Sequence, residues 1–271
     1  MIRIHGDLEQ RRMSRVAQQL FGVFRELGKE PLIGRDGGWI DRFVQRYLSR
    51  HGLSSAMVSY RGYPAYTSVS LNDVAIHGVP GTREIARGDI FTLDVAAYGG
   101  GYVADAAWTY YTEGVSRKDR NLINAGWAAF LTIIREIGPG TGVGEIGANA
   151  VRCAARAGLT IIPEFVGHGI GRELHEEPMI PFVGHSGEPR SGDIRLRPGM
   201  IVNIEPVFTG GAAAILPAED GWGYRTADAS KTVHFELSLL ITPTGAEVLQ
   251  FGGVSPASLP DTPPFGSIRG Q

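Results

Sequence analysis

Two aspartates interrupt adjoining apolar stretches of the chain. Asp94 lies in IFTLDVAAYGG and Asp105 in GGYVADAAWTYY, and both stretches otherwise have the composition of buried strands. The glycine pair 99–100 suits the two-residue turn of a β-hairpin. With Tyr98 paired to Gly101, this hairpin predicts that Asp94 lies directly opposite Asp105, with Cβ atoms about 4.5–5.5 Å apart.

Two carboxylates at that distance repel each other, and a buried strand solvates neither of them well. The pair is therefore expected to share a proton or to bind a cation. Two alternatives stay open at this point. A three-residue turn would stagger the pair, or one aspartate could lie at a solvated strand end.

Three more candidate ligands interrupt apolar strands later in the chain. His168 lies between glycines in EFVGHGIGRELHEEP, Glu205 lies in LRPGMIVNIEPVF, and Glu236 lies in KTVHFELSLLIT. Carboxylate oxygens with one imidazole suit Mn(II), Fe(II), Co(II) or Zn(II). A lone His or Glu in such a place is usually structural, but four carboxylates with one neutral His match the charge of two divalent ions. Two such ions can activate a water and stabilise an oxyanion.

The other histidines are expected to have no part in the chemistry. His5, His51 and His185 occur in polar or helical surroundings and are predicted to lie at the surface. His234 lies two residues before Glu236 and therefore on the same strand face. We expect it at the surface, with a supporting place beside the ligands as the alternative.

The elements that must position these residues alternate between helices and blocks of strands. Helical spacing of apolar residues predicts helices over 7–27, around 40–48, over 119–137 and over 144–157, with Gly158 ending the last. Strands are predicted over 66–71, 74–77, 89–98, 101–112, 162–168, 200–208 and 232–242. This order favours two similar α+β halves around one sheet. No linker divides the chain, so we expect one domain over 1–252 and a Pro/Gly/Ser-rich tail over 253–271.

Composition limits the classes of function. The 271 residues carry a formal net charge of -2, with 43% hydrophobic and 20% charged residues, which is ordinary for a soluble globular protein. Nothing in this balance indicates nucleic acid or an anionic membrane as a partner. The single cysteine, Cys153, excludes an intrachain disulfide and is expected to be a buried apolar residue. With no apolar signal region and no membrane-spanning stretch, a cytoplasmic protein is expected.

Six segments together resemble, in order and spacing, the type I methionine aminopeptidases: SLNDVAIHGVPG, GDIFTLDV, ADAAWT, GHGIGRELHEEP, LRPGMIVNIEPVF and DGWGYRTADASKTVHFELSLLIT. The resemblance spans roughly residues 8–250 and implies the pita-bread fold, an α+β domain whose curved antiparallel sheet has pseudo-two-fold symmetry and is flanked by helices. It implies an enzyme that removes the N-terminal methionine from nascent proteins or peptides, using a water activated by two metal ions (Co, Mn, Fe or Zn). It also implies a monomer whose partners are N-terminal peptide substrates, with the ribosome exit region as a further candidate.

The resemblance assigns a role to each matching residue. The implied metal ligands are Asp94, Asp105, His168, Glu205 and Glu236, with Asp105 and Glu236 bridging both ions. Asp94 would bind one ion, and His168 and Glu205 the other. Glu205 would also act as general base. His77 would contact the scissile amide or the leaving nitrogen, and His175 would hydrogen-bond the substrate carbonyl and stabilise the tetrahedral intermediate.

The implied pocket for the methionine side chain departs from the family pattern. Its residues would be Tyr60, Tyr63, Ser68, Leu174 and Trp222. Ser68 stands where Cys is frequent, Leu174 where Phe is usual, and Ala106 where a small hydroxyl residue commonly follows the second aspartate. These changes remove no ligand, although they could loosen side-chain selection or alter metal affinity. The segment 184–196 looks longer than is typical and is expected to be a surface insertion.

Two alternative functions stay in view. An X-Pro dipeptidase or aminopeptidase shares the implied fold, but such enzymes usually carry a separate N-terminal domain, for which this chain is too short. A non-catalytic pita-bread module that binds peptides or the ribosome would normally have lost metal ligands, and all five are present here. The sequence therefore favours the aminopeptidase.

Overall fold

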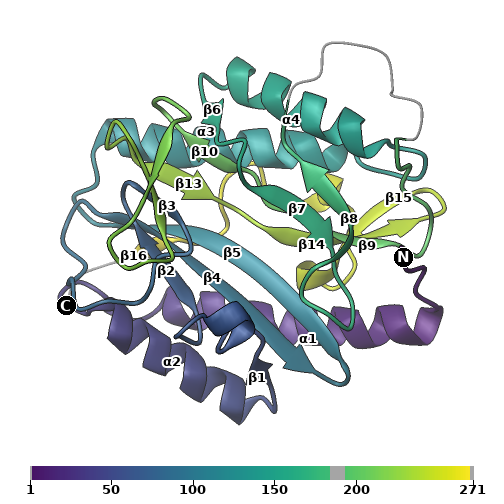
Figure 1. Cartoon of the computed structure of the whole chain (residues 1–271), viewed down its shortest axis with the longest axis horizontal. Coiled ribbons are helices and arrows are strands. Elements are labelled where there is room, and N and C mark those ends of the chain that lie inside the picture. The colour runs from purple at the N-terminus through teal and green to yellow at the C-terminus, as the bar shows by residue number, and fades with distance from the viewer. Residues whose placement is uncertain (1, 184–192, 269–271) are drawn as a thin grey trace.

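Four helices enclose a set of small sheets in the computed structural model, which describes residues 2–183 and 193–268. Figure 1 shows two helices along one side of the strands and the other two along the opposite side. The helices are α1 (Asp7–Leu27), α2 (Gly37–Arg50), α3 (Arg117–Arg135) and α4 (Val143–Arg156). The four predicted helices are confirmed, and Gly158 has the positive φ of 71° expected beyond the end of α4.

The strands form four sheets among the described residues. The first contains β1 (Ser54–Ser55), β2 (Ser68–Leu71), β4 (Ile90–Gly99), β5 (Tyr102–Thr112) and β16 (Ser267–Ile268). The second contains β7 (Val166–Gly169), β8 (Glu176–Pro181), β9 (Ile201–Ile204), β14 (Leu237–Thr242) and β15 (Gly245–Val248). Two three-stranded sheets contain β6 (Thr160–Ile161), β10 (Val207–Thr209) and β13 (Thr232–His234), and β3 (Val74–Ile76), β11 (Ile215–Pro217) and β12 (Tyr224–Thr226). Short 3₁₀ turns cover Tyr60–Gly62, Leu249–Phe251 and Pro256–Ser258.

The register of the β4–β5 hairpin differs by two residues from the predicted register. Gly99 pairs with Tyr102, so the turn residues are Gly100 and Gly101, both at positive φ. Asp94 consequently lies opposite Ala107 and not opposite Asp105. Because the shift is even, the two aspartates keep the same face and become diagonal neighbours. The run of three glycines allowed either turn, and the sequence alone did not distinguish them.

Two predicted strands are each broken in the structure. The stretch 200–208 divides into β9 and β10 at Glu205 and Pro206, and 232–242 divides into β13 and β14 at Phe235 and Glu236. The two pieces of each stretch belong to different sheets. Both proposed ligand glutamates therefore lie where the chain passes from one sheet to another.

Helix α1 packs its apolar stripe on the β4–β5 side of the molecule. Leu20, Phe21 and Phe24 are fully buried, and the ring of Phe21 meets Trp108 of β5 edge-on at a centroid distance of 5.6 Å. The hydroxyl of Tyr110, also on β5, donates to the carbonyl of Phe24 at 2.7 Å. This contact fixes the long strand that carries Asp105.

The C-terminal segment packs onto the molecule. The indole nitrogens of Trp108 and Trp127 donate to the carbonyls of Phe265 (3.2 Å) and Pro260 (2.9 Å). The Phe265 ring stacks on Trp108 at 4.3 Å. Strand β16 then pairs in parallel with β5, with Ser267 opposite Tyr111. The segment predicted as a tail or surface wrap thus supports the strand that carries Asp105.

Two surface predictions are wrong. His5 is only 4% exposed because its backbone N–H donates to the Gly199 carbonyl and places the ring under the chain. His234 is 1% exposed because β13, although an edge strand of its own sheet, packs against β5, where Thr109 bonds to both the N–H and the carbonyl of His234. His51 is exposed and Cys153 is buried, as expected.

Part of the predicted insertion 184–196, with His185, lies outside the described residues. In its described part, Asp193 accepts a hydrogen bond from the Gly144 N–H at 3.1 Å and so caps the start of α4. Among the helices of the described chain, none has the length and apolar character needed to cross a membrane.

Candidate metal centre and substrate cavity

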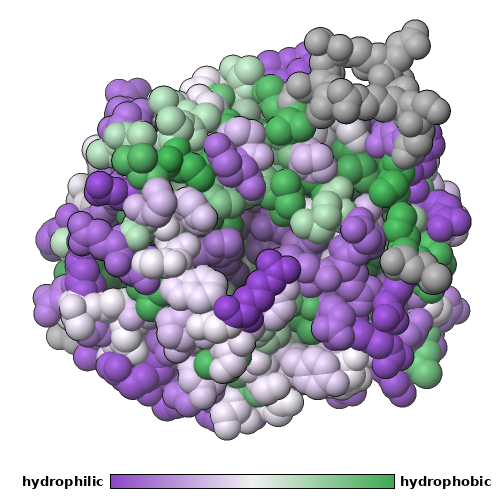
Figure 2. Space-filling model, viewed as in Figure 1, coloured by the Kyte–Doolittle hydropathy of each residue, from purple (hydrophilic) through white to green (hydrophobic). Residues whose placement is uncertain are grey.

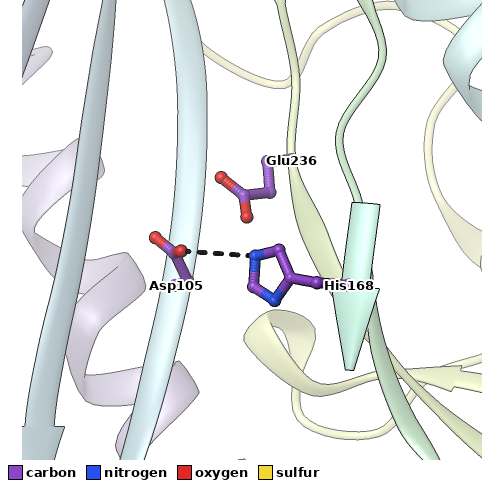
Figure 3. A group of neighbouring side chains, drawn as sticks. All are labelled: Asp105, His168 and Glu236. Carbon is purple, nitrogen blue, oxygen red and sulfur yellow. Dashed lines mark ion pairs between the residues drawn. The ribbon is translucent and has the colours of Figure 1, made fainter. Parts of the chain in front are cut away.

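Carboxylates from three parts of the chain converge with one imidazole. Figure 3 shows the side chains of Asp105, His168 and Glu236 pointing toward one another from separate segments of the chain. One ligand atom from each of the three lies within 4.8 Å of the others. All three side chains are buried, so this is a polar group placed deep in the protein.

His168 presents one nitrogen to the carboxylates. Its Nδ1 lies 2.9 Å from the Gly169 carbonyl, which can only accept, so Nδ1 carries the hydrogen. The other nitrogen, Nε2, lies 3.1 Å from Glu205 Oε1 and 3.9 Å from Asp105 Oδ2. When the ring is neutral, this tautomer leaves the lone pair of Nε2 facing the carboxylates, as a metal ligand requires.

The glycines on either side of His168 are a packing requirement. A Cβ at Gly167 would overlap the Asn203 carbonyl of β9, and a Cβ at Gly169 would overlap the Glu177 carbonyl of β8. The register between β7 and β8 also shifts at His168 and Gly169. Close strand contact and a bulge are typical reasons for glycine in a strand, and here they aim His168 at the cluster.

Asp94 completes the carboxylate group from β4. It is half-buried and pairs across the strands with Ser68 of β2. Burial, together with the charges of Asp105 and Glu205, raises the pKa of Asp94 well above its ordinary value. A carboxylate so close to others therefore resists ionisation unless a cation compensates it.

The same conflict affects the other members. Burial raises the pKa of Asp105 to about 7, with His168 opposing the rise and Glu205 adding to it. Burial and the charges of Asp105, Glu205 and Asp94 raise the pKa of Glu236 well above its ordinary range. Burial disfavours the imidazolium of His168, but the carboxylates of Glu205 and Asp105 outweigh it and raise the pKa of His168 to about 9.

The donor set fits divalent cations. Asp105 Oδ1 and Glu205 Oε1 are buried and have no hydrogen-bond partner among the residues described; the contact of Glu205 Oε1 with His168 Nε2 is short but poorly directed. Buried polar atoms are almost always satisfied, and leaving one unpaired costs about 1–3 kcal/mol. Hard oxygens plus one imidazole would satisfy a Mn(II), Fe(II), Co(II) or Zn(II) ion and be satisfied by it.

A buried chain of two amides and one hydroxyl, which the sequence analysis did not predict, connects the carboxylate of Glu236 to the backbone carbonyl of Asp105. Asn203 Nδ2 donates to Glu236 Oε1 at 2.6 Å, and Ser238 Oγ donates to Asn203 Oδ1 at 2.6 Å. Gln250 Nε2 donates to Ser238 Oγ at 3.0 Å and to the Asp105 carbonyl at 2.9 Å. We name Asn203, Ser238 and Gln250 the amide relay. It fixes the rotamer of Glu236 relative to the backbone of Asp105.

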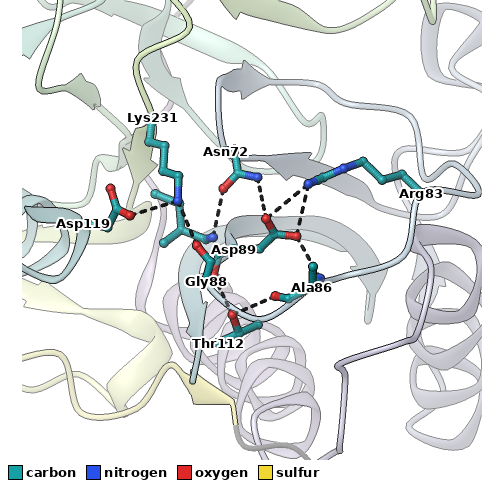
Figure 4. Close-up of polar contacts among 9 residues, drawn as sticks. Asn72, Arg83, Ala86, Gly88, Asp89, Thr112, Asp119 and Lys231 are labelled. Atoms are coloured by element: carbon teal, nitrogen blue, oxygen red, sulfur yellow. Dashed lines mark hydrogen bonds and ion pairs between the residues drawn. The ribbon is translucent and has the colours of Figure 1, made fainter. Parts of the chain in front are cut away.

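A second polar group holds the start of β4. Figure 4 shows the buried Asp89 between Asn72 and Arg83. Its carboxylate accepts from Asn72 Nδ2 at 2.8 Å, from Arg83 Nη2 at 3.2 Å and from the Ala86 N–H at 2.9 Å. Asn72 Oδ1 in turn accepts the N–H of Ile90, the first residue of β4. The strand that bears Asp94 is thereby fixed to the β2–β3 turn.

The carboxylates lie at the base of a cavity of about 250 Å³. Figure 2 shows that the face of the molecule seen in Figure 1 is hollowed near its middle. The lining combines the five proposed ligands with two other histidines, one arginine and a wall of apolar and aromatic residues. The histidines are His77 and His175, the arginine is Arg61, and the wall contains Met57, Tyr60, Tyr63, Ile76, Ala96, Leu174 and Trp222. A polar base under an apolar wall suits a small substrate with one apolar side chain.

The two other histidines border the ligands. The ring of His175 lies 4.4 Å from that of His168, and its Nδ1 lies 2.8 Å from the Tyr60 hydroxyl. Burial, with the neighbouring His168, Arg61 and His77, lowers the pKa of His175 to about 4. His77 has a positive φ of 59° and remains reachable by solvent within the cavity, whose walls still lower its pKa by desolvation. Both imidazoles are therefore neutral near pH 7.

The predicted pocket residues divide into two groups. Tyr60, Tyr63, Leu174 and Trp222 line the cavity, and Tyr63 meets Trp222 edge-on at 5.3 Å. Ser68 does not line it. Ser68 is fully buried in β2, with its Oγ 3.4 Å from Ser70 Oγ, and its part in substrate binding stays a prediction.

The sequence analysis missed four of the lining residues: Met57, Arg61, Ile76 and Ala96. Arg61 has a positive φ of 50° in the Tyr60–Gly62 turn. Single apolar residues carry no chemical signal, and the conformation that brings Arg61 to the cavity is not readable from spacing.

Residues 11–243 match the model of metallopeptidase family M24. Methionine aminopeptidase 1 of Bacillus subtilis is 33% identical over 210 residues, which are 78% of this chain and 83% of that protein.

Solved structures agree with the family match. The crystal structure of methionine aminopeptidase from Thermotoga maritima has a TM-score of 0.87 at 33% identity and covers 92% of this chain and 99% of that chain. Xaa-Pro dipeptidase from Bacillus anthracis has a TM-score of 0.72 at 25% identity and covers 91% of this chain but 61% of that one. The likeness therefore extends over nearly the whole of the first protein and over a part of the second.

Proposed function

The chain belongs to metallopeptidase family M24 and has its pita-bread fold, and from this premise we propose that it is a methionine aminopeptidase. It would hydrolyse the first peptide bond of peptides and new proteins and release the N-terminal methionine. One observation carries the proposal: a cluster of buried carboxylates and His168 forms the base of a cavity with an apolar aromatic wall.

The metal centre would hold two divalent ions. The residues that would hold them are Asp94, Asp105, His168, Glu205 and Glu236, all of which line the cavity. Bound ions supply a nucleophilic water at neutral pH and Lewis-acid stabilisation of negative charge. The unpaired oxygens of Asp105 and Glu205 support this assignment, as does the rise in pKa of Asp105, which a nearby cation would reverse.

His175 is proposed to donate a hydrogen bond to the substrate carbonyl. If the Tyr60 hydroxyl donates to Nδ1 of His175, the ring hydrogen lies on Nε2 and is available to the substrate. The ring of His175 stays uncharged throughout the neutral pH range and keeps this tautomer, because its pKa is lowered to about 4. Such a donor stabilises the transition state where negative charge develops on the oxygen.

Glu205 is proposed as the general base and His77 as the group that contacts the amide nitrogen. The proposal is supported by the position of Glu205, which lies 3.1 Å from His168 and lines the cavity. A base must lie within hydrogen-bond reach of the proton that it removes. His77 lines the same cavity and has a neutral ring near pH 7.

The cavity also explains a preference for chain ends. The carboxylates at its base favour a positively charged or metal-directed amino group, and the wall of Tyr63, Leu174 and Trp222 offers apolar contact to one side chain. A volume of about 250 Å³ accommodates one residue of the methionine type and little more.

The proposal is tested by release of free methionine from a Met-Gly tripeptide. Chelated enzyme is assayed alone and after addition of Mn(II), Co(II), Fe(II) or Zn(II), with a Met-Pro and an Ala-Pro peptide in parallel. Metal-restored cleavage of the Met-Gly bond supports the proposal. Cleavage restricted to X-Pro peptides assigns the chain to the X-Pro enzymes, and no cleavage by folded, metal-loaded protein contradicts an aminopeptidase function.

Partners and cellular location belong to the same proposal. We propose a monomer that acts in the cytoplasm on N-terminal peptide segments, with the ribosome exit region as a site of action. The free buried thiol of Cys153 is compatible with a reducing compartment. Sedimentation of the purified protein tests the monomer, and co-sedimentation with ribosomes tests the second partner.

A further inference from the structure

His234 has a fixed backbone and a ring that the proposed mechanism does not use. It is the last residue of β13, and Thr109 of β5 holds it on both sides: the His234 N–H donates to Thr109 Oγ1 at 2.8 Å, and Thr109 Oγ1 lies 2.9 Å from the His234 carbonyl as a donor. The side chain is 1% exposed. These two hydrogen bonds between β13 and β5 fix the position of the His234 backbone.

Neither ring nitrogen of His234 has a hydrogen-bond partner in the part of the chain that the structure describes. A neutral imidazole has one donor and one acceptor, and protein interiors pair almost all such groups. His168 shows the contrast, because its Nδ1 contacts the Gly169 carbonyl. A buried histidine with both nitrogens unpaired indicates a missing partner.

Two carboxylates that we propose as metal ligands, Glu205 and Glu236, lie beside the ring of His234. One ring nitrogen of His234, one oxygen of Glu205 and one oxygen of Glu236 lie within 4.8 Å of one another. Glu236 also belongs to the group with Asp105 and His168. His234 therefore lies beside the cluster at Glu236, the carboxylate that both groups share.

We propose that His234 is an additional metal ligand, which gives the cation shared by Glu205 and Glu236 a second imidazole besides His168. This inference rests on the proposed function, since it extends the same centre. A second nitrogen donor makes the site less hard, so it favours Co(II) and Zn(II) over Mn(II) more than a site with one imidazole does. The cation would also satisfy one of the two unpaired ring nitrogens.

The direct test counts the histidines bound to Co(II) in the wild-type protein. Each coordinated imidazole keeps one ring N–H close to the paramagnetic ion, so proton NMR in water shows one strongly shifted, exchangeable signal per histidine ligand. We expect two such signals, and protein made with ¹⁵N-labelled histidine identifies them as ring N–H groups. A single signal from Co(II)-loaded, folded protein overturns the proposal.

Variants assign the signals and measure the contribution of His234. His234→Gln should remove one signal, weaken binding of Co(II) at least about tenfold by calorimetry, and lessen the preference for Co(II) over Mn(II). His168→Gln should remove the other signal. The exposed His51 gives the control, because His51→Gln changes a histidine outside the cavity and should leave both signals and the affinity unaltered.

The outcomes separate this inference from the function on which it rests. If wild type binds Co(II) and releases methionine but His234→Gln keeps both its shifted signals and its affinity, His234 is not a ligand and the aminopeptidase stands. If His234→Gln loses activity without losing a signal, the residue only positions Glu205 or Glu236, and the ligand proposal is wrong. If wild type binds no divalent metal, both proposals fail.

Discussion

Burial of Asp105 in the cluster lowers the stability of the metal-free protein near neutral pH, and the same burial provides a carboxylate for metal binding. It is buried beside Glu205 and Glu236, and its pKa is raised to about 7. Without metal, the folded state therefore favours the protonated form, while the unfolded chain ionises near the ordinary value of 3.8. Protonated Asp105 contributes stability to the folded state at pH values below 3.8, and this contribution is lost as the pH rises from 3.8 toward 7.

Asp105→Asn should separate function from stability. Loss of a charged shared ligand should lower methionine release by more than about 100-fold, since even a supporting partner of a metal site contributes 10–100-fold. The metal-free variant should be more stable than metal-free wild type at pH 8, because it no longer ionises a buried group. Urea unfolding of both chelated proteins at pH 5 and pH 8 measures this. Near-normal turnover, or a variant less stable at pH 8, contradicts the assignment.

His175→Ala tests the proposed hydrogen bond to the substrate carbonyl. A donor that acts mainly in the transition state should affect kcat about 10²–10³-fold and KM far less. Steady-state kinetics on a Met-Gly tripeptide provide both constants, and Co(II) binding shows that the metal centre is intact. A change confined to KM would assign His175 to substrate binding alone.

The roles predicted for single residues depend on chemistry that residue types reveal. Asp94, Asp105, His168, Glu205 and Glu236 stand out in sequence because each interrupts an apolar strand, and all five line one cavity. The motif around Ser68 does not show which face of its strand is turned toward the cavity, and the structure places Ser68 in the buried interior of β2. The sequence placed His234 on the strand face of Glu236 but did not decide between the surface and a place beside the ligands, since a histidine in a strand looks the same whether it is solvated or buried.

The breaks between β9 and β10 and between β13 and β14 belong to the scale of the element. The apolar pattern through 200–208 and 232–242 continues across each break, so periodicity predicted single strands. Pro206 is the one local signal, because proline cannot donate to a ladder. The change of sheet at Glu236 has no comparable signal and depends on contact with β5, where the Glu236 N–H donates to the Ala107 carbonyl at 3.0 Å.

Asn203→Ala tests the amide relay. The substitution leaves Glu236 Oε1 without its 2.6 Å donor, so the glutamate should lose its fixed orientation and metal affinity should fall about 10–100-fold. Calorimetric titration with Co(II) is the measurement. Asn149 in α4 is a buried asparagine remote from the cavity, and Asn149→Ala should lower stability while metal affinity is retained. Equal metal affinities for the two variants would contradict a role for the relay.

The segment before α1 should make the protein sensitive to acid. Burial lowers the pKa of His5 below its ordinary value of 6.5, against the opposing charges of Glu9 and Glu176. The unfolded chain thus takes up a proton before the folded one, and the free energy of unfolding decreases as the pH falls below 6.5. In His5→Asn this decrease between pH 7 and pH 5 should be shallower. The exposed-site variant His51→Gln should follow the wild-type slope in the same urea titration.

At the scale of the whole molecule, the order of helices and strand blocks was enough to predict the fold class. The helices were recoverable because each has a strong apolar stripe, and the long β4–β5 hairpin because glycines separate two apolar runs. The division into four small sheets was not recoverable, because it depends on contacts between strands far apart in the chain. The packing of 253–268 escaped prediction for the same reason.

Phe265→Ala tests how much the C-terminal segment contributes to stability. The ring is half-buried, stacks on Trp108 at 4.3 Å and approaches Phe21 at 5.7 Å. Its removal should cost about 2 kcal/mol, less than the 3–5 kcal/mol of a fully buried Phe. Urea unfolding measures this loss of stability, with Leu216→Ala as the control. Leu216 is 47% exposed, so its replacement should cost less than about 0.5 kcal/mol. Equal losses would show that the segment lies on the molecule without supporting it.

The spread of the proposed ligands along the chain has a consequence for biosynthesis. Asp94 and Asp105 are made early, on one hairpin, whereas Glu236 follows only after most of the chain has left the ribosome. Before Glu236 is made, the growing chain already contains Asp94, Asp105, His168 and Glu205, and it lacks the last of the five proposed ligands. A chain interrupted before Glu236 would therefore lack one proposed ligand, and we expect it to bind divalent metal more weakly than the complete chain.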